Sequence, residues 1–119
     1  MGKVEIYGIK NCDTMKKAFD WLNANGIAYT FHDYKVEGIS QSKLGEWLHH
    51  VDLWKLLNTK SSTWRETLDT AKATITGKEE AIPFLMEKTS AIKRPVVEYK
   101  GGYLLGFDQK EWENALKSS

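Results

Sequence analysis

The change of hydrophobic period along the first part of the chain is the sequence feature that most restricts the fold. Residues 3–7 alternate polar with apolar side chains, as a strand with one buried face does. Met15, Ala18 and Leu22 then recur at the spacing of one helix face, and residues 27–32 alternate again. A strand, a helix and a second strand in so short a segment indicate a βαβ unit with parallel strands and a right-handed crossover. We therefore expect an α/β fold.

The pattern becomes helical over residues 36–87 and then returns to strands. Short amphipathic segments follow one another in this middle region, which we interpret as a helical insertion. Pro95 ends the helical pattern, and residues 96–105 predict a hairpin with a Gly-rich turn. Asp108 opens a D-x-x-E helix start, with Trp112 on the apolar face of the helix that follows. The predicted order is βαβ, helical insertion, ββα.

Two helices of the insertion are predicted from particular residues. Trp64 and Leu68 stand at positions i and i+4 after a pair of serines, so they are expected on one face of a short helix. Pro83 is tolerated in the first turn of a helix but not in its interior. The helix that contains it is therefore expected to begin at about Glu80.

A chain of 119 residues is long enough for one domain with its own hydrophobic core. We assign residues 1–119 to a single domain, with the core at about 1–35 and 88–119 and the helical insertion at about 36–87. A monomer is the expected state.

The charge balance and the apolar segments restrict the partners and the location. The net charge of +1 provides no general attraction to nucleic acid or to a membrane surface. No stretch approaches the roughly 20 apolar residues of a membrane span. A single cysteine cannot form an internal disulfide, which agrees with a reducing compartment. We expect a soluble cytoplasmic protein without direct nucleic-acid or membrane binding.

Cys12 is the only cysteine, and its surroundings allow two interpretations. Lone cysteines of cytoplasmic proteins are often buried and inert. Cys12, however, lies between a predicted strand end and a predicted helix start, the edge of an α/β sheet at which ligands usually bind. Free amide donors and the helix dipole favour a thiolate there, and Lys10, Lys16 and Lys17 add positive charge. We favour a reactive thiol with a lowered pKa.

The absence of a second cysteine predicts a monothiol mechanism. Positions 9 and 15 hold Ile and Met, so the chain has no C-x-x-C motif. A covalent adduct on Cys12 is then released only by an outside thiol, such as glutathione or a redoxin. Asn11, Asp13 and Thr14 flank the thiol and offer backbone or side-chain hydrogen bonds to a substrate.

Arg94 and Pro95 form the second candidate feature. One interpretation is a surface arginine beside a proline that opens a strand. The other is that Pro95 fixes the backbone beside the thiol loop, with Arg94 as a fork for a carboxylate, a phosphate or a similar oxyanion.

Arg65 and the paired histidines are weaker candidates. Arg65 is either a surface charge or a second anion contact. His49 and His50 are adjacent, so on a helix they point in different directions and cannot face one metal ion. No metal site is predicted.

Several segments together resemble the ArsC/Spx family of thioredoxin-like proteins, and within it the YffB-like subgroup. They are YGIKNCDTMKKAFDWL, FHDYKVEG, LLNTKSSTWR, IKRPVV and GFDQKEW. The match covers nearly the whole chain, and NCDT together with IKRP is its most specific part. The resemblance implies a thioredoxin-like α/β core, in which βαβ and ββα units form a mixed four-stranded sheet interrupted by a helical insertion. It also implies that Pro95 is a cis-proline facing the cysteine loop.

In glutaredoxin-coupled arsenate reductases of this family, a cysteine attacks arsenate, glutathione resolves the adduct and three arginines hold the oxyanion. Cys12 matches that cysteine and Arg94 matches one arginine, but the other two positions hold Asn58 and Phe107. A histidine usual upstream of the cysteine is replaced around Gly8. Each lost charge-assisted hydrogen bond is worth roughly 1.5–3 kcal/mol. Arsenate is therefore not the expected substrate.

The leading hypothesis is a glutathione-dependent thiol reductase, similar to arsenate reductases, with Cys12 and Arg94 as catalytic residues. Its substrate-binding residues are Asn11, Asp13, Thr14, Arg65 and Pro95. No bound cofactor is expected, and glutathione or a glutaredoxin is the partner. The alternative is an Spx-type regulator or adaptor that binds RNA polymerase. The C-x-x-C switch of Spx itself cannot form in this chain.

Overall fold

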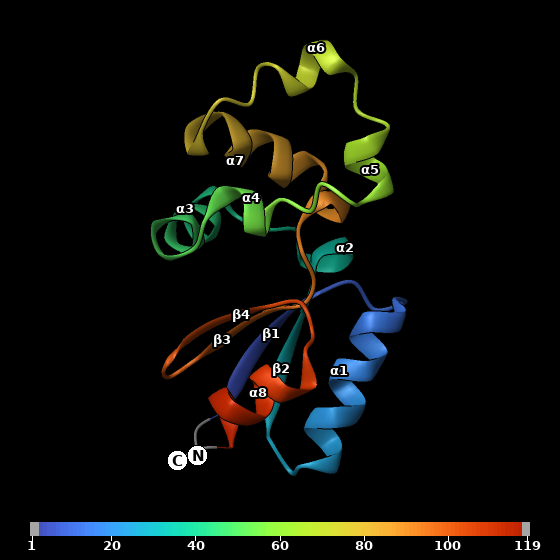
Figure 1. The fold of residues 1–119 in the computed structure, drawn as a ribbon, viewed down its shortest axis with the longest axis vertical. Helices are drawn as coiled ribbons and strands as arrows, with labels where there is room; N and C mark the ends of the chain where they lie inside the picture. The colour runs from blue at the N-terminus through green and yellow to red at the C-terminus, as the bar shows by residue number, and fades with distance from the viewer. Residues whose placement is uncertain (1–2, 118–119) are drawn as a thin grey trace. The chain divides into compact units, whose positions relative to one another are not determined.

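The computed structural model describes residues 3–117, which divide into two compact units. The first unit runs to Tyr34 and resumes at Arg94, and the second unit consists of residues 35–93 (Figure 1). The second unit includes residues 36–87, the region interpreted from the sequence as a helical insertion. The assignment of the whole chain to a single domain stays a prediction.

A four-stranded sheet with two helices makes up the first unit. Its elements are β1 (Val4–Gly8), α1 (Asp13–Ala24), β2 (Tyr29–Asp33), β3 (Val96–Tyr99), β4 (Gly102–Leu105) and α8 (Gln109–Leu116). The strand order is β2-β1-β3-β4, with β1 parallel to β2 and every other pair antiparallel. The order and the mixed directions are those of a thioredoxin-like core, so the predicted fold class is confirmed.

The core of this unit lies between one face of the sheet and the two helices. Ile6 and Val97 are register partners on that face, and both are fully buried. Leu22 from α1 and Trp112 from α8 belong to the same hydrophobic cluster. The Trp112 indole donates a hydrogen bond to the carbonyl oxygen of Gly106 at 3.1 Å, so its buried N–H is satisfied. The apolar side chains that recur every 3.6 residues along both helices thus pack against the sheet face formed by every second residue of the strands.

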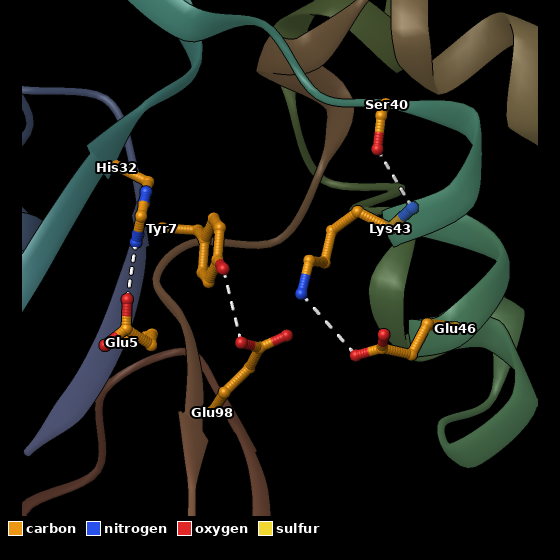
Figure 2. Close-up of polar contacts among 7 residues, drawn as sticks. All are labelled: Glu5, Tyr7, His32, Ser40, Lys43, Glu46 and Glu98. Atoms are coloured by element: carbon orange, nitrogen blue, oxygen red, sulfur yellow. Dashed lines mark hydrogen bonds and ion pairs between the residues drawn. The ribbon is translucent and has the colours of Figure 1, made fainter.

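Polar side chains occupy the other face of the sheet (Figure 2). The rings of Tyr7 and His32 stack with centroids 4.4 Å apart. The Tyr7 hydroxyl donates to Glu98 Oε1 at 3.2 Å, and His32 Nε2 lies 2.7 Å from Glu5 Oε1. Glu5 and Glu98 are register partners on neighbouring strands, where two like charges repel each other. The stacked pair therefore gives each carboxylate its own partner.

Short helices make up the second unit. They are α2 (Tyr34–Glu37), which starts in the first unit, α3 (Gln41–His50), α4 (Leu53–Leu56), α5 (Ser62–Arg65), α6 (Asp69–Lys72), α7 (Lys78–Glu87) and the 3₁₀ turn η1 (Thr89–Ala91). Ser40 caps α3, because its hydroxyl oxygen accepts from the Lys43 amide at 3.0 Å (Figure 2). Leu57 and Ile92 form an isolated antiparallel bridge inside the unit. Among residues 3–117, no helix is both long and apolar enough to span a membrane.

The short helix predicted at the paired serines is confirmed as α5, because the Ser61 hydroxyl oxygen accepts from the Trp64 amide at 3.1 Å and caps it. Its expected extent was wrong, since α5 ends at Arg65 and the Leu68 side chain, expected on the same helix face as Trp64, is 74% exposed. Trp64 packs edge-on against Phe84 instead, with ring centroids 5.6 Å apart. The helix around Pro83 begins at Lys78 rather than at about Glu80, which places the proline in its interior. Tertiary packing overrides the local signals in both cases, and buried Leu85 anchors α7 despite the hydrogen bond that Pro83 removes.

Candidate active site around Cys12

Strand directions bring distant parts of the chain to one edge of the sheet. β1 and β2 are parallel, so their carboxyl ends lie at the same edge, where Gly8 pairs with Asp33. The Cys12 loop follows β1 at this edge, and Tyr34 follows β2. β3 is antiparallel to β1 and begins there, because Val96 pairs with Tyr7. Open α/β sheets bind ligands at such an edge.

Cys12 occupies the N-cap position of α1. Its backbone is extended, with φ −147° and ψ 131°, and its carbonyl oxygen accepts from the Lys16 amide at 2.9 Å. The side chain is half-buried. The Met15 and Thr14 N–H groups favour the thiolate, although the thiol makes no regular capping hydrogen bond. The position predicted for Cys12, at the start of a helix after a strand, is confirmed.

Arg94 contacts the thiol directly. Its Nε–H donates a hydrogen bond to Cys12 Sγ at 3.4 Å, across a separation of 82 residues. Burial raises the pKa of Cys12, whereas the hydrogen bond from Arg94, the backbone amides and the Arg94 charge lower it. The net effect places the pKa of Cys12 below its ordinary value. Since the thiolate is the nucleophilic form, this arrangement activates the sulfur at lower pH.

The Arg94–Pro95 peptide bond is cis, as the family resemblance implied. The carbonyl oxygen of Pro95 accepts from the Gly106 amide at 2.8 Å, which joins the start of β3 to the end of β4. Pro95 therefore lies at the same sheet edge as the thiol loop. Its role in binding a substrate stays a prediction.

The other predicted substrate-binding residues fall into two groups. Asn11, Asp13 and Thr14 lie in the loop and first turn beside the thiol. Arg65 ends α5 in the second unit, and its side chain is exposed. Substrate binding by all four residues stays a prediction.

Asn58 and Phe107, which stand at the expected arginine positions, have structural contacts. Asn58 Oδ1 accepts from the Lys60 amide at 3.1 Å, so this side chain shapes its own loop. Phe107 packs edge-on against Trp112 with ring centroids 4.8 Å apart, and it borders the core of the first unit. Neither side chain carries the positive charge that an arsenate oxyanion would require.

The glycine at the expected histidine position is explained by close packing. A Cβ atom built on Gly8 would lie 2.5 Å from Met15 Sδ, and the Met15 side chain is fully buried. A histidine at position 8 would therefore displace Met15. At the end of β1, position 8 therefore serves the packing of Met15 and does not supply a second titratable group beside the thiol loop.

Tyr34 is a residue of this sheet edge that sequence reasoning missed. Its side chain is 3% exposed, and its buried hydroxyl has no hydrogen-bond partner among the residues that the structure describes. The signal available in the sequence was its place immediately after β2, next to the loop that follows the parallel β1. Across residues 3–117, no cluster of three or more His, Cys, Asp or Glu side chains is arranged to hold a metal ion.

The mixed sheet, the cysteine at the start of α1 and the cis-proline before β3 define a thioredoxin-like protein of the single-cysteine kind. The chain belongs to the ArsC family, whose family model matches residues 7–115. The similarity to the YffB-like subgroup is also confirmed by the comparisons that follow.

Several similar proteins match this chain over almost its whole length. The solved structure of a protein named YffB is 40% identical and superposes with a TM-score of 0.89, covering 95% of this chain and 98% of that one. An arsenate reductase (ArsC) related protein from Brucella melitensis is 39% identical with a TM-score of 0.76, covering 99% and 97%. A protein of Haemophilus influenzae described only as uncharacterised is 38% identical over 113 residues, covering 95% and 98%.

Proposed function

We propose that this protein is a thiol reductase that uses Cys12 as its single nucleophile and glutathione, or a glutaredoxin, as its reductant. The observation that carries the proposal is the 3.4 Å hydrogen bond from Arg94 Nε to Cys12 Sγ. Membership of the ArsC family and the similarity to an arsenate reductase (ArsC) related protein support it.

The reaction consists of two thiol–disulfide exchanges at Cys12, followed by a third exchange between glutathione and the released mixed disulfide. The Cys12 thiolate attacks one sulfur of a disulfide substrate, a new S–S bond forms at Sγ, and the other half of the substrate leaves as a thiolate. A glutathione thiolate then attacks the substrate sulfur, which frees Cys12 and leaves the substrate half joined to glutathione. A second glutathione completes the reduction and yields glutathione disulfide. Arg94 stabilises the Cys12 thiolate as nucleophile in the first exchange and as leaving group in the second.

Arsenate is a poorer candidate than a disulfide for the substrate. Arg94 matches one of the three arginines found in the arsenate reductases of the family. The other two positions hold Asn58 and Phe107, which are uncharged and make loop and core contacts. A disulfide carries no oxyanion charge at the reacting sulfur, so the exchange has less need of further cations. The Spx-type alternative stays a prediction, together with its RNA polymerase partner and a cytoplasmic location.

The test is formation of a mixed disulfide with glutathione. Wild-type protein and the Cys12→Ser variant would be incubated with glutathione disulfide, and their intact masses compared before and after addition of excess glutathione. We expect one glutathione adduct on the wild type, reversed by the reduced thiol, and none on Cys12→Ser. A wild-type protein that stays unmodified, with a thiol that titrates at its ordinary pKa, would rule out the proposal.

A further inference from the structure

A buried hydroxyl without a partner lies at the edge of the sheet that carries Cys12. The whole Tyr34 side chain is 3% exposed, and its hydroxyl makes no hydrogen bond with the described residues. Leaving a buried donor unsatisfied costs stability that phenylalanine at the same position would not lose. Unsatisfied buried groups in native proteins call for an explanation, and a role in function is one.

Strand pairing places Tyr34 beside the loop that carries the thiol: Tyr34 follows Asp33, which pairs with Gly8 at the end of β1, and the Cys12 loop begins after Gly8. Arg94 donates its hydrogen bond to Cys12 Sγ, and its charge also acts on the Tyr34 phenol. Burial, Tyr7 and Glu98 raise the pKa of Tyr34, and Arg94 lowers it only in part. The phenol therefore keeps its proton at neutral pH and remains a hydrogen-bond donor.

We infer that the Tyr34 hydroxyl is a substrate-binding group of the thiol site, which donates a hydrogen bond to an oxygen acceptor on the group that becomes joined to Cys12. The inference rests on the proposed function. It assigns the preferred substrate class: disulfides of peptide-like thiols, such as glutathione disulfide, which carry amide carbonyl or carboxylate oxygens close to the sulfur. Because the hydroxyl is covered in the free protein, the contact forms when the adduct displaces the side chains that cover it.

The test compares two disulfides that differ in their acceptors. Glutathione disulfide has carbonyl and carboxylate oxygens, whereas cystamine has a short chain with no oxygen acceptor. The equilibrium constants for modification of Cys12 would be measured for wild type and Tyr34→Phe with each disulfide. We expect Tyr34→Phe to lose about three- to tenfold with glutathione, the effect of one hydrogen bond, and to match the wild type with cystamine.

Tyr7→Phe is the matched control, because it also removes a buried hydroxyl from the first unit. The Tyr7 hydroxyl is bonded to Glu98, so its loss should lower the melting temperature without changing the preference between the disulfides. Tyr34→Phe, by contrast, should melt at the wild-type temperature or above it, since it removes an unsatisfied group. An equal loss with both disulfides would assign Tyr34 a merely structural role, and no loss with either would overturn the inference.

A readout on the wild type keeps the inference testable if Tyr34→Phe does not fold. The NMR signal of the Tyr34 ring carbon bonded to oxygen should shift when Cys12 is joined to glutathione, and stay in place when it is joined to cysteamine. An unchanged signal in the glutathione adduct would contradict the inference. Failure of the wild type to form any glutathione adduct would instead overturn the proposed function itself.

Discussion

The Arg94 guanidinium is the cationic group that acts on the half-exposed thiol of Cys12. Its Nε–H donates directly to the sulfur, and its charge adds to the effect of the amides at the start of α1. The lysines near Cys12 in the sequence suggested the same direction of the pKa shift. The cationic cause in the folded protein is Arg94, a residue far along the chain.

Replacing Arg94 should therefore make the thiol less acidic. In Arg94→Met the hydrogen bond and the charge are both lost, so the pKa of Cys12 rises and alkylation by iodoacetamide requires higher pH. Alkylation rates measured across pH would show the profile of Arg94→Met displaced to higher pH. Lys10→Met, which removes an exposed charge beside the loop, serves as control and should keep the wild-type profile.

The unsatisfied hydroxyl of Tyr34 costs stability, and we infer that this cost is tied to substrate binding. Sites of this kind are places where one polar group remains unsatisfied until a ligand is bound. The expectation that Tyr34→Phe is no less stable than the wild type, yet discriminates less between disulfides, follows from that single hydroxyl.

At the scale of elements, the end of β1 packs closely against α1. The backbone of Gly8 leaves room for the Met15 side chain, which would lie 2.5 Å from a Cβ atom at position 8. Met15 is fully buried, so the flexible end of its side chain has little space to move into. The Cys12 loop joins these two elements, and its geometry depends on how they pack.

Gly8→Ala should destabilise the protein by about 1–3 kcal/mol, the typical effect of overpacking a buried site. Unfolding in urea would measure the change. Gly45→Ala is the matched control, because position 45 lies inside α3 and nothing lies within 4 Å of an added Cβ. That change should stabilise the chain by about 0.5–1 kcal/mol, since alanine favours a helix over glycine. Equal effects of the two substitutions would contradict the packing argument.

In the whole molecule, the second unit is inserted into the chain at the edge of the sheet that carries the candidate site. The first unit ends with Tyr34 and resumes at Arg94, so both residues stand at the points where the insertion leaves and rejoins it. The thioredoxin-like core is thereby kept intact while a long segment is added. Tyr34 and Arg94 are separated in the sequence by the entire second unit but belong to one edge of one sheet.

The lowered pKa of Cys12 links the stability of the molecule to pH. At pH values between the folded and the unfolded pKa, the unfolded chain binds a proton that the folded chain does not. The stabilisation from the thiolate is therefore fully present above the unfolded pKa and is lost as pH falls through the folded pKa. Urea unfolding of wild type and Cys12→Ser across this window should show the difference in unfolding free energy increasing with pH in favour of the wild type. A difference that does not vary with pH would contradict the lowered pKa.

Local sequence patterns predicted the βαβ and ββα units, the helical region between them and the position of the cysteine at a helix start. Period-two and 3.6-residue patterns identify β1 and α1 because each buries one face, and β2 because Tyr29 and Phe31 pack partly buried against the core. Asp108 marks the start of α8 through a local cap. The resemblance to the ArsC family also rested on local segments. These features depend on neighbours in the chain, so they can be recognised without the fold.

The groups that meet Cys12 from distant parts of the chain could not be predicted from local patterns. The Arg94 hydrogen bond, the partnerless Tyr34 hydroxyl and the tight contact of Gly8 with Met15 depend on strand directions and register. The true bounds of α5 and α7 likewise follow from packing around Trp64 and Leu85. Such contacts join residues far apart in the chain, and their energies outweigh the local preferences from which helix bounds are predicted.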